Sequence, residues 1–295
     1  MRIVRPATID DAALISTTAA ETVAAYDSGT TYALGQQVRD DATHRIFESG
    51  QNANLGNALA DPAWWFDVGP ANQWAMFDTV NGTVTTGPAG LDVVVQPVGR
   101  IDSVALLNLD AATAQIIMTD ATDGEIYNET FNLVAEAGIT DWYAYFYEPI
   151  VRRNLLILTG LPLYSGPEIE VILAAGGGGV SVGTMIVGQV KQIGSTEAGA
   201  SVGIVDYSRK EADDFGNYQL VQRAFARKAS FRVMIDGGEV DEIDRLLSQY
   251  RATPILYIGS EIFGAAAVFG FYRDFNIEIA YPTYAFCSLE LEGLT

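Results

Sequence analysis

The sequence has few of the residues on which several classes of function depend. It holds one cysteine, Cys287, and one histidine, His44, among 295 residues. An intrachain disulfide is therefore impossible, a histidine-rich metal site is excluded, and a Ser-His-Asp triad could be built only on His44. The segment around His44 alternates like a strand, which does not favour catalysis. We predict no catalytic residue, no metal and no cofactor, and hence a protein that is not an enzyme.

Positive charge is also scarce. There are 17 Lys and Arg residues against 37 Asp and Glu, a net charge of −20 at pH 7. A surface for nucleic acid or anionic membrane needs clustered bases, whereas the three lysines are spread through the C-terminal half, at Lys191, Lys210 and Lys228. We expect no nucleic-acid partner and no membrane insertion. Residues 1–150 carry a net −15 and residues 151–295 a net −5, so the two halves should face different surroundings.

Long apolar runs are missing as well. The N-terminus lacks the apolar core of a signal peptide. The apolar stretch Phe263–Tyr272 is too short for a membrane span and is interrupted by glycine. We therefore expect the protein to be synthesised in the cytoplasm without a signal peptide. It would function outside a cell only after lysis or as part of a particle.

Signals for β-strands dominate what is present. Short runs rich in β-branched residues are separated by Gly, Asp, Asn and Pro turns at intervals of about ten residues, which is typical of an antiparallel sandwich. These runs are Val93–Val95, Val104–Leu107, Ala114–Met118, Leu155–Leu158, Ile169–Leu173 and Met185–Val187. Residues 275–280 and 287–292 alternate with period two and predict a terminal strand pair. The four glycines at 176–179 predict a turn, because no phosphate-loop Lys-Ser/Thr follows them.

One amphipathic helix is predicted between Gly237 and Pro254. Its apolar residues share one face: Val240, Ile243, Leu246, Leu247 and Tyr250. The fold class predicted from these patterns is mainly β, in three parts. Residues 1–80 form an extended arm and a small β-module, residues 85–188 an antiparallel, jelly-roll-like β-sandwich, and residues 189–295 a β-rich α+β domain that contains the helix.

Paired carboxylates are the remaining enzymatic option, because glycoside hydrolysis needs two of them. Asp40-Asp41, Asp213-Asp214 and the acids at 239–242 are candidates. In a chain with 37 acids such neighbours are expected by chance and face solvent. Residues 120–125 partly resemble a calcium-binding loop, but they lack the 12-residue ligand spacing of an EF-hand. We favour a turn without a bound ion at these residues, and a turn that binds a single cation remains the alternative.

An aromatic cluster is the strongest candidate for a binding site. Three of the four tryptophans lie at 64, 65 and 74, and Tyr26 and Tyr32 precede them. Flat aromatic faces stack on sugar rings without any need for positive charge. The alternative is that a small module uses its aromatics as a core. Both interpretations stay open, and Trp64 and Trp65 should point to opposite faces of a strand.

Residues 25–69 carry an ordered set of turn, glycine and aromatic positions. The segments are Tyr26-Asp-Ser-Gly-Thr-Thr-Tyr32-Ala-Leu-Gly35-Gln-Gln-Val38, Arg45-Ile-Phe47-Glu-Ser49 and Trp64-Trp65-Phe66-Asp67-Val68-Gly69. In this order they resemble the chitin- and cellulose-binding modules of bacterial chitinases. The resemblance implies a carbohydrate-binding module, and we predict that the sugar contacts Tyr26, Tyr32, Trp64, Trp65 and Trp74.

Residues 69–78, 199–216, 223–227 and 270–294 are similar to tail proteins of bacteriophages, in particular distal-tail and baseplate proteins. The middle segment, with Trp142-Tyr143-Ala-Tyr145-Phe and Asn154-Leu-Leu-Ile-Leu, is similar to galactose-binding jelly rolls. The resemblance implies a virion structural protein of the tail tip. Its partners would be further copies of itself in a hexameric or trimeric ring, other tail proteins and a host surface glycan. Ion pairs between subunits would involve Arg209, Arg223, Arg227 and Arg232, unless these are ordinary solvated charges.

Two alternatives share the same module. One is a carbohydrate-active enzyme, a depolymerase with an appended binding module, which the many carboxylates would allow. The other is a free lectin. Release of reducing ends would indicate the enzyme, and a stable higher oligomer would count against the lectin.

Overall fold

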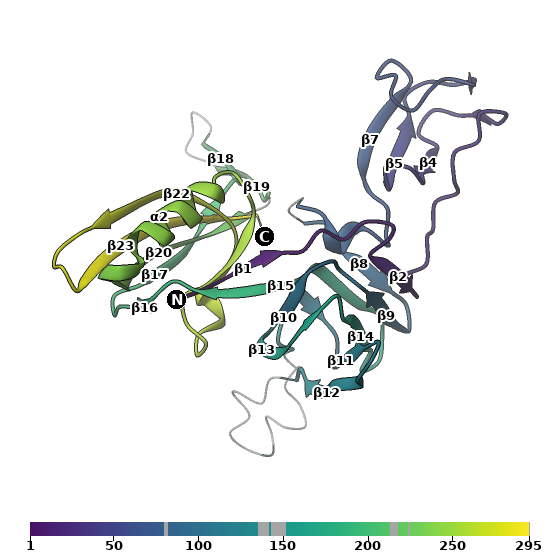
Figure 1. Ribbon diagram of the computed structural model, residues 1–295. Coiled ribbons are helices and arrows are strands. Elements are labelled where there is room, and N and C mark those ends of the chain that lie inside the picture. The colour runs from purple at the N-terminus through teal and green to yellow at the C-terminus, as the bar shows by residue number, and fades with distance from the viewer. Residues whose placement is uncertain (80–81, 135–141, 143–151, 213–217, 224, 295) are drawn as a thin grey trace.

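The computed structural model describes residues 1–79, 82–134, 142, 152–212, 218–223 and 225–294. It confirms the mainly β architecture of antiparallel sheets, with a central sandwich and a helix in the C-terminal part (Figure 1). Among the described residues, no helix has both the length and the apolar character that a membrane crossing requires. The motif at residues 143–146 and the carboxylates at 213 and 214 lie outside the described residues.

The central sandwich consists of two antiparallel sheets that face each other. Its strands are β2 (Leu14–Thr17), β8 (Thr85–Gly87), β9 (Gly90–Val95), β10 (Arg100–Asp110), β11 (Thr113–Asp120), β12 (Gly124–Asn132), β13 (Leu155–Ser165), β14 (Glu168–Ala174) and β15 (Val180–Gln192). One sheet has the order β12-β11-β14-β9-β2, and the other starts β13-β10-β15 with β8 beside β15. Buried and less buried residues alternate along β9 and β14, because successive side chains point to opposite faces. The six predicted strands therefore lie where the sequence indicated.

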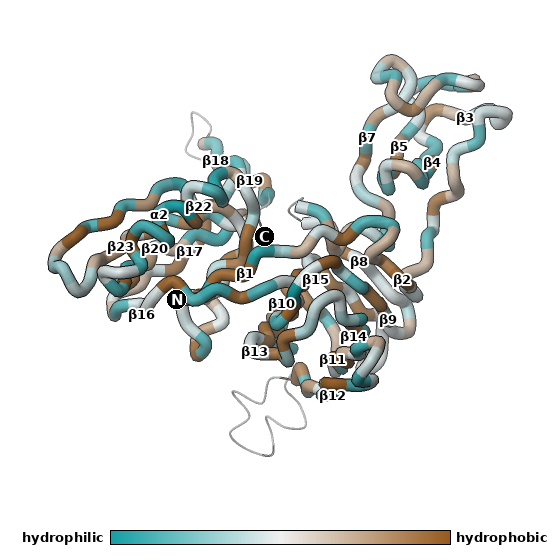
Figure 2. Tube along the Cα trace, in the orientation of Figure 1, coloured by the Kyte–Doolittle hydropathy of each residue, from teal (hydrophilic) through white to brown (hydrophobic). Residues whose placement is uncertain are grey.

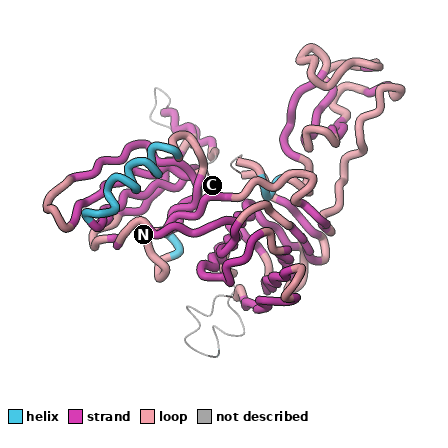
Figure 3. The backbone as a smooth tube through the Cα atoms, in the orientation of Figure 1, coloured by secondary structure: helices cyan, strands magenta, loops and turns pink. Residues whose placement is uncertain are grey.

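The C-terminal part is a sheet covered by the predicted helix. Its elements are β16 (Ser195–Thr196), β17 (Ser201–Asp206), β18 (Arg209–Ala212), β19 (Tyr218–Val221), β20 (Phe225–Asp236), η2 (Gly237–Glu239), α2 (Val240–Gln249), β21 (Ile255–Ile258), η3 (Gly264–Ala266), β22 (Ala267–Glu278) and β23 (Tyr284–Gly293). Ile243 and Leu247 of α2 are buried in one cluster with Phe231 and Tyr257 of the sheet. Figure 3 shows the helix lying along these strands. The hairpin of β18 and β19 pairs with no other described strand.

A single short strand joins the two larger parts. β1 (Arg2–Pro6) lies between β15 and β21, so that Arg2 pairs with Gln192 on one side and with Ile258 on the other. The result is one sheet of 11 strands that runs from the sandwich into the C-terminal part. The boundary predicted between residues 188 and 189 falls inside β15.

The N-terminal module stands apart from this body (Figure 1). Its strands are β3 (Thr31–Tyr32), β4 (Gln37–Asp40), β5 (Arg45–Ser49), β6 (Asn54–Leu55) and β7 (Trp65–Pro70), and η1 (Ala75–Phe77) follows where the chain returns to the body. They form a three-stranded sheet, β4-β5-β7, and the separate pair β3-β6. Figure 2 shows that hydrophobic and hydrophilic residues are mixed along the module.

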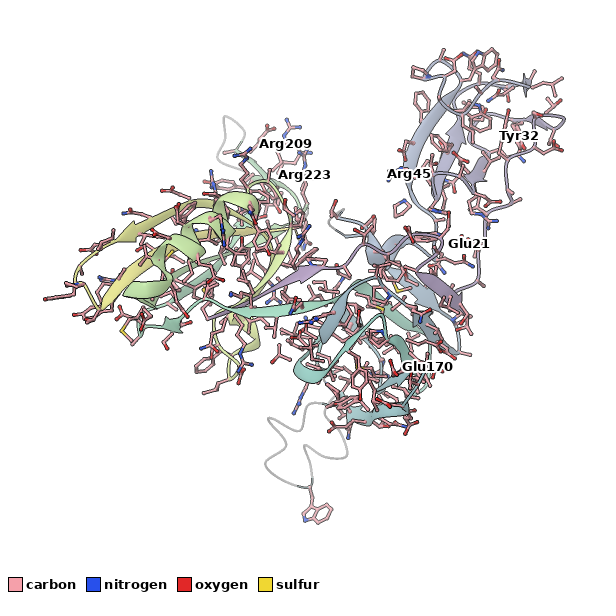
Figure 4. All side chains as sticks on the ribbon, in the orientation of Figure 1. Glu21, Tyr32, Arg45, Glu170, Arg209 and Arg223 are labelled. Atoms are coloured by element: carbon pink, nitrogen blue, oxygen red, sulfur yellow. The ribbon has the colours of Figure 1, made fainter. Side chains whose placement is uncertain are left out.

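Two segments connect the module to the body, and hydrogen bonds join these segments to each other. The Glu21 carboxylate accepts hydrogen bonds from the backbone N–H groups of Asn72 (3.2 Å) and Gln73 (2.8 Å). The Asn72 side-chain amide donates to the carbonyls of Ala20 and Thr86, both at 3.0 Å. Figure 4 shows Glu21 at the foot of the module. Because entry and exit are tied to each other and to the strand β8, the module is attached at a defined point.

Candidate functional site

The module has an aromatic core, and two predicted sugar-binding residues belong to it. Tyr32 and Trp65 are only 4% and 3% exposed. Their ring centroids lie 5.3 Å apart in an edge-on arrangement, and Tyr26 packs against both, at 5.8 Å and 5.6 Å. So small a fold needs bulky anchors to bury enough apolar surface. The sugar contacts predicted at Tyr32 and Trp65 stay predictions, and the structure places both side chains in this core, with neither ring face open to solvent.

The polar ends of these rings are also used inside the module. The Tyr26 hydroxyl (2.7 Å) and the Trp65 Nε1 (3.1 Å) both donate to the carbonyl of Asn57. Burial raises the pKa of Tyr26, as does the neighbouring Tyr32. Tyr26 is half-buried, and its hydroxyl serves to fix the loop at Asn57. Its main contribution is to packing rather than to an open binding surface.

Trp74 lies at the foot of the module. Its ring stacks on His44, with centroids 3.9 Å apart and planes inclined by 17°. The His44 Nε2 is 3.1 Å from Asp11 Oδ1, and both residues line a cleft of about 480 Å³ together with Glu21 and Arg39. One face of Trp74 is thus taken by His44, and the contact joins the module to the body. The structure does not bring Trp74 together with the other predicted residues.

The outer face of the three-stranded sheet presents a different aromatic ring. Phe66 follows Trp65 in β7 and, because adjacent residues point to opposite faces, it is 57% exposed. A Cβ placed on Gly50 would come within 2.6 Å of Phe66 Cε2. The ring therefore lies directly on the backbone at Gly50, in space that only glycine leaves free. Contact on one side and exposure on the other make Phe66 a fixed, open platform.

Hydrogen-bonding groups stand beside this platform. In the registered strands Gln37 lies opposite Glu48, and Glu48 lies opposite Phe66, so the three side chains form one row across the sheet. The Gln37 Nε2 donates to Glu48 Oε2 at 3.1 Å. The row combines an aromatic ring, an amide and a carboxylate. We call Gln37, Glu48 and Phe66 the Phe66 row.

Trp64 lies next to the module core at the entry to β7. Its side chain is half-buried and packs against the cluster of Tyr32, Val38 and Trp65. Its carbonyl accepts hydrogen bonds from the Gly50 N–H at 2.8 Å and from Asn54 Nδ2 at 3.4 Å. Of the five predicted residues, Trp64 is the one that combines partial exposure with a position in the sequence next to the Phe66 row.

Sequence reasoning missed Phe66, Gln37 and Glu48 as site residues, although a signal was present. Once Trp65 is assigned to the core, period two places Phe66 outside. The contact with Gly50 could not be read in this way, because it joins residues on neighbouring strands whose register is set by the folded module.

Comparisons with known proteins give one partial likeness. No protein-family model matches the chain, and no curated protein matches its sequence. Among solved structures, it is similar to chitosan-binding module 1 of a chitosanase/glucanase from Paenibacillus sp. IK-5. The match covers 38% of this chain and 81% of that module, at 14% identity and a TM-score of 0.26. The likeness is to a carbohydrate-binding module over part of the chain, and a TM-score of this size carries no argument about the ligand here.

Proposed function

We propose that this chain is a non-catalytic, glycan-binding structural protein. The observation that carries the proposal is the Phe66 row, in which an exposed ring held on the backbone of Gly50 stands beside a hydrogen-bonded amide and carboxylate. An aromatic ring takes up the C–H face of a pyranose, and the amide and carboxylate are the groups that hydroxyls need as partners. The glycan class is neutral or amine-bearing, because the acidic chain repels phosphate and sulfate.

The attachment of the module supports a role in presentation. The bonds from Glu21 and Asn72 fix the two connecting segments, and the His44–Trp74 stack adds a second contact at the foot of the module. The Phe66 row lies on the module itself and not on the body. A site that is attached in this way suits binding to a surface outside the particle or protein that carries it.

A second surface supports assembly. Seven of the 20 large apolar side chains that are exposed in the described chain lie between residues 202 and 225. Tyr218 and Leu220 of the β18–β19 hairpin are 72% and 70% exposed. An isolated two-stranded hairpin is at most marginally stable in water, and clustered exposed apolar residues mark contact sites. We infer that the hairpin packs on another copy of the chain.

The finer proposal follows from the resemblance in sequence. We propose that the oligomer is a ring at a phage tail tip or baseplate, that the C-terminal part contacts other tail proteins, and that the module reaches the host surface. Arg209 pairs with Glu211 at 2.6 Å, and Arg232 lies 3.4 Å from both Glu197 and Glu278. Arg223 and Arg227 make no ion pair within the described residues. These two are the better candidates for contacts outside the chain.

The proposal is tested with purified protein and with virions. Insoluble chitin and cellulose should retain the protein, and incubation should release no reducing ends. Failure to bind any neutral glycan contradicts the binding role, and release of reducing ends contradicts the non-catalytic one. Electron microscopy of the virion tests the location, since absence of the chain from the tail rules out the tail-tip role whatever the glycan result.

A further inference from the structure

A cleft of about 1,100 Å³ lies between the central sandwich and the loop that leads into β22. One wall consists of seven consecutive residues of β13, from Leu155 to Leu161. If a face of the strand formed the wall, alternate residues would line it. Because every residue does so, the cleft runs along the edge of β13. That strand pairs with β10 alone among the described strands.

The open edge of β13 is apolar and unpaired among the described strands. Leu155, Leu156, Ile157 and Leu158 are four successive large apolar residues, and all are half-buried although they lie in a sheet. Their backbone N–H and C=O groups on the cleft side have no sheet partner among the described strands. Proteins normally blunt such an edge with charge, proline or a covering element, because it is a template for strand addition.

The charge around the cleft is unusual for this chain. Acids outnumber bases by 37 to 17, yet Arg153 and Arg227 on the cleft wall have no carboxylate partner within the described residues. An adjoining cavity of about 340 Å³ shares Asn154, Leu155, Arg227 and Ala267 with the cleft. It adds Arg223, which is likewise unpaired in the described chain. Several guanidinium groups without a carboxylate partner among the described residues give this cleft a positive charge that suits an acidic ligand.

We propose that the cleft binds an extended, acidic segment of a partner polypeptide, which pairs with β13 as an added strand. Backbone hydrogen bonds to the open edge supply affinity without regard to sequence. Alternate apolar side chains of the segment pack on the half-buried leucines. Its carboxylates pair with Arg153 and Arg227, and bidentate pairing favours arginine over lysine for this role. The site is separate from the Phe66 row and does not depend on glycan binding.

The test uses the full chain and two fluorescent blocked peptides of equal length. One alternates valine with glutamate, and the other alternates valine with lysine. Fluorescence anisotropy is measured up to about 1 mM peptide. The glutamate peptide should bind, and hydrogen exchange should slow at residues 155–161. The double variant Arg153→Glu/Arg227→Glu should bind at least about tenfold more weakly. The control is Arg245→Glu on α2, an exposed arginine away from the cleft, which makes half of the change in net charge.

Each result decides the proposal. No binding of the glutamate peptide, equal binding of the lysine peptide, or protection elsewhere than in β13 overturns it. Equal loss in the Arg245→Glu control also overturns it, because the effect would then come from net charge alone. A Phe66→Ala variant should bind the peptide like the parent, so failure of the glycan proposal and failure of this one are distinguishable.

Discussion

Two of the surfaces on which the chain exposes apolar residues differ in what lies behind and beside those residues. Phe66 stands on a sheet whose other face is a packed aromatic core, and it has Gln37 and Glu48 in the same row. Tyr218 and Leu220 stand on a two-stranded hairpin that pairs with no other described strand. In that hairpin Leu220 lies opposite Lys210 and Tyr218 opposite Ala212.

The difference separates two kinds of recognition. A ring fixed over glycine and flanked by hydrogen-bonding groups can select a small, hydroxyl-rich ligand without rearrangement. A two-stranded hairpin with exposed apolar residues and no core behind it is stabilised when a partner covers it, as happens at an assembly contact. We therefore expect substitutions in the two surfaces to have independent effects.

The largest expected effect is on the module itself. Trp65→Ala should lower the free energy of unfolding of the module by about 3–5 kcal/mol, because it empties the centre of a small core. Glycan binding should be lost with the fold, while assembly and the unfolding of the body are unchanged. Scanning calorimetry and hydrogen exchange would show this. A loss of protection that extends into the sandwich would mean that the module is not an independent unit.

The second effect concerns the hairpin. Tyr218→Asp combined with Leu220→Asp should weaken association of copies by about 2–4 kcal/mol, the scale of burying two large apolar side chains. Sedimentation velocity measures the change. Phe66→Asp is the control, since it places one such charge on the other exposed apolar surface and should leave the oligomer intact. A monomeric parent protein, or an oligomer unaffected by the double variant, contradicts the assembly role.

The third effect is on the glycan. Phe66→Ala should weaken glycan binding by about 1–3 kcal/mol, which is the loss of one aromatic platform, whereas Phe66→Tyr should retain it. Trp64→Ala tests the half-buried neighbour on the same scale. Isothermal titration with a soluble oligosaccharide is the measurement. If folded Phe66→Ala binds as well as the parent, the platform lies elsewhere in the module.

A smaller change tests whether the position of the Phe66 ring matters for glycan binding, without removing the ring. Gly50→Ala places a methyl group 2.6 Å from Phe66 Cε2, so the ring must tilt away from its support. We expect glycan affinity to fall by about 1 kcal/mol, the order of an off-rotamer side chain. Ser49 next to it is buried in the module and should keep its place. A variant with unchanged affinity would show that the fixed position of the ring is unimportant.

The smallest effect lies away from both surfaces. Burial, with help from Asp92 and Glu168, raises the pKa of Glu170 in the sandwich. A carboxyl group with a raised native pKa binds more protons in the folded state, so its contribution to stability falls as the pH rises above about 4.5. Glu170→Gln should remove that fall and gain a few tenths of a kcal/mol at pH 7 after solvent screening. Denaturant titrations at several pH values measure it, and neither glycan binding nor association should change.

Local patterns were sufficient for the parts of the fold that are locally determined. Six sandwich strands carry runs of β-branched residues between turns, and the apolar residues of α2 recur every three to four positions, so each of these elements was predicted from its own residues. β1 was not, because its five residues carry no signal of the partners that lie at Gln192 and Ile258. The hairpin of β18 and β19 escaped for a related reason, since neither strand has a buried face to produce alternation.

The sequence predicted an aromatic binding module, and the structure places Tyr32 and Trp65 in its core and Phe66 on its surface. Composition identifies a module rich in aromatics, and it cannot decide which of them fill the core. That choice depends on strand register, which places Trp65 opposite the buried Ser49 and Phe66 opposite the half-buried Glu48. A shift of one residue would exchange the two faces.

The insertion of β1 between β15 and β21 also sets an order of events during synthesis. The partners of β1 are made about 180–190 and about 250 residues later. At ribosomal rates that is a delay on the order of 10–50 s. The module closes its own sheets within some 40 residues of sequence, so it can fold first, while β1 stays unpaired. Until β21 emerges the large sheet remains open at its centre, and this is the interval in which the nascent chain most needs a chaperone.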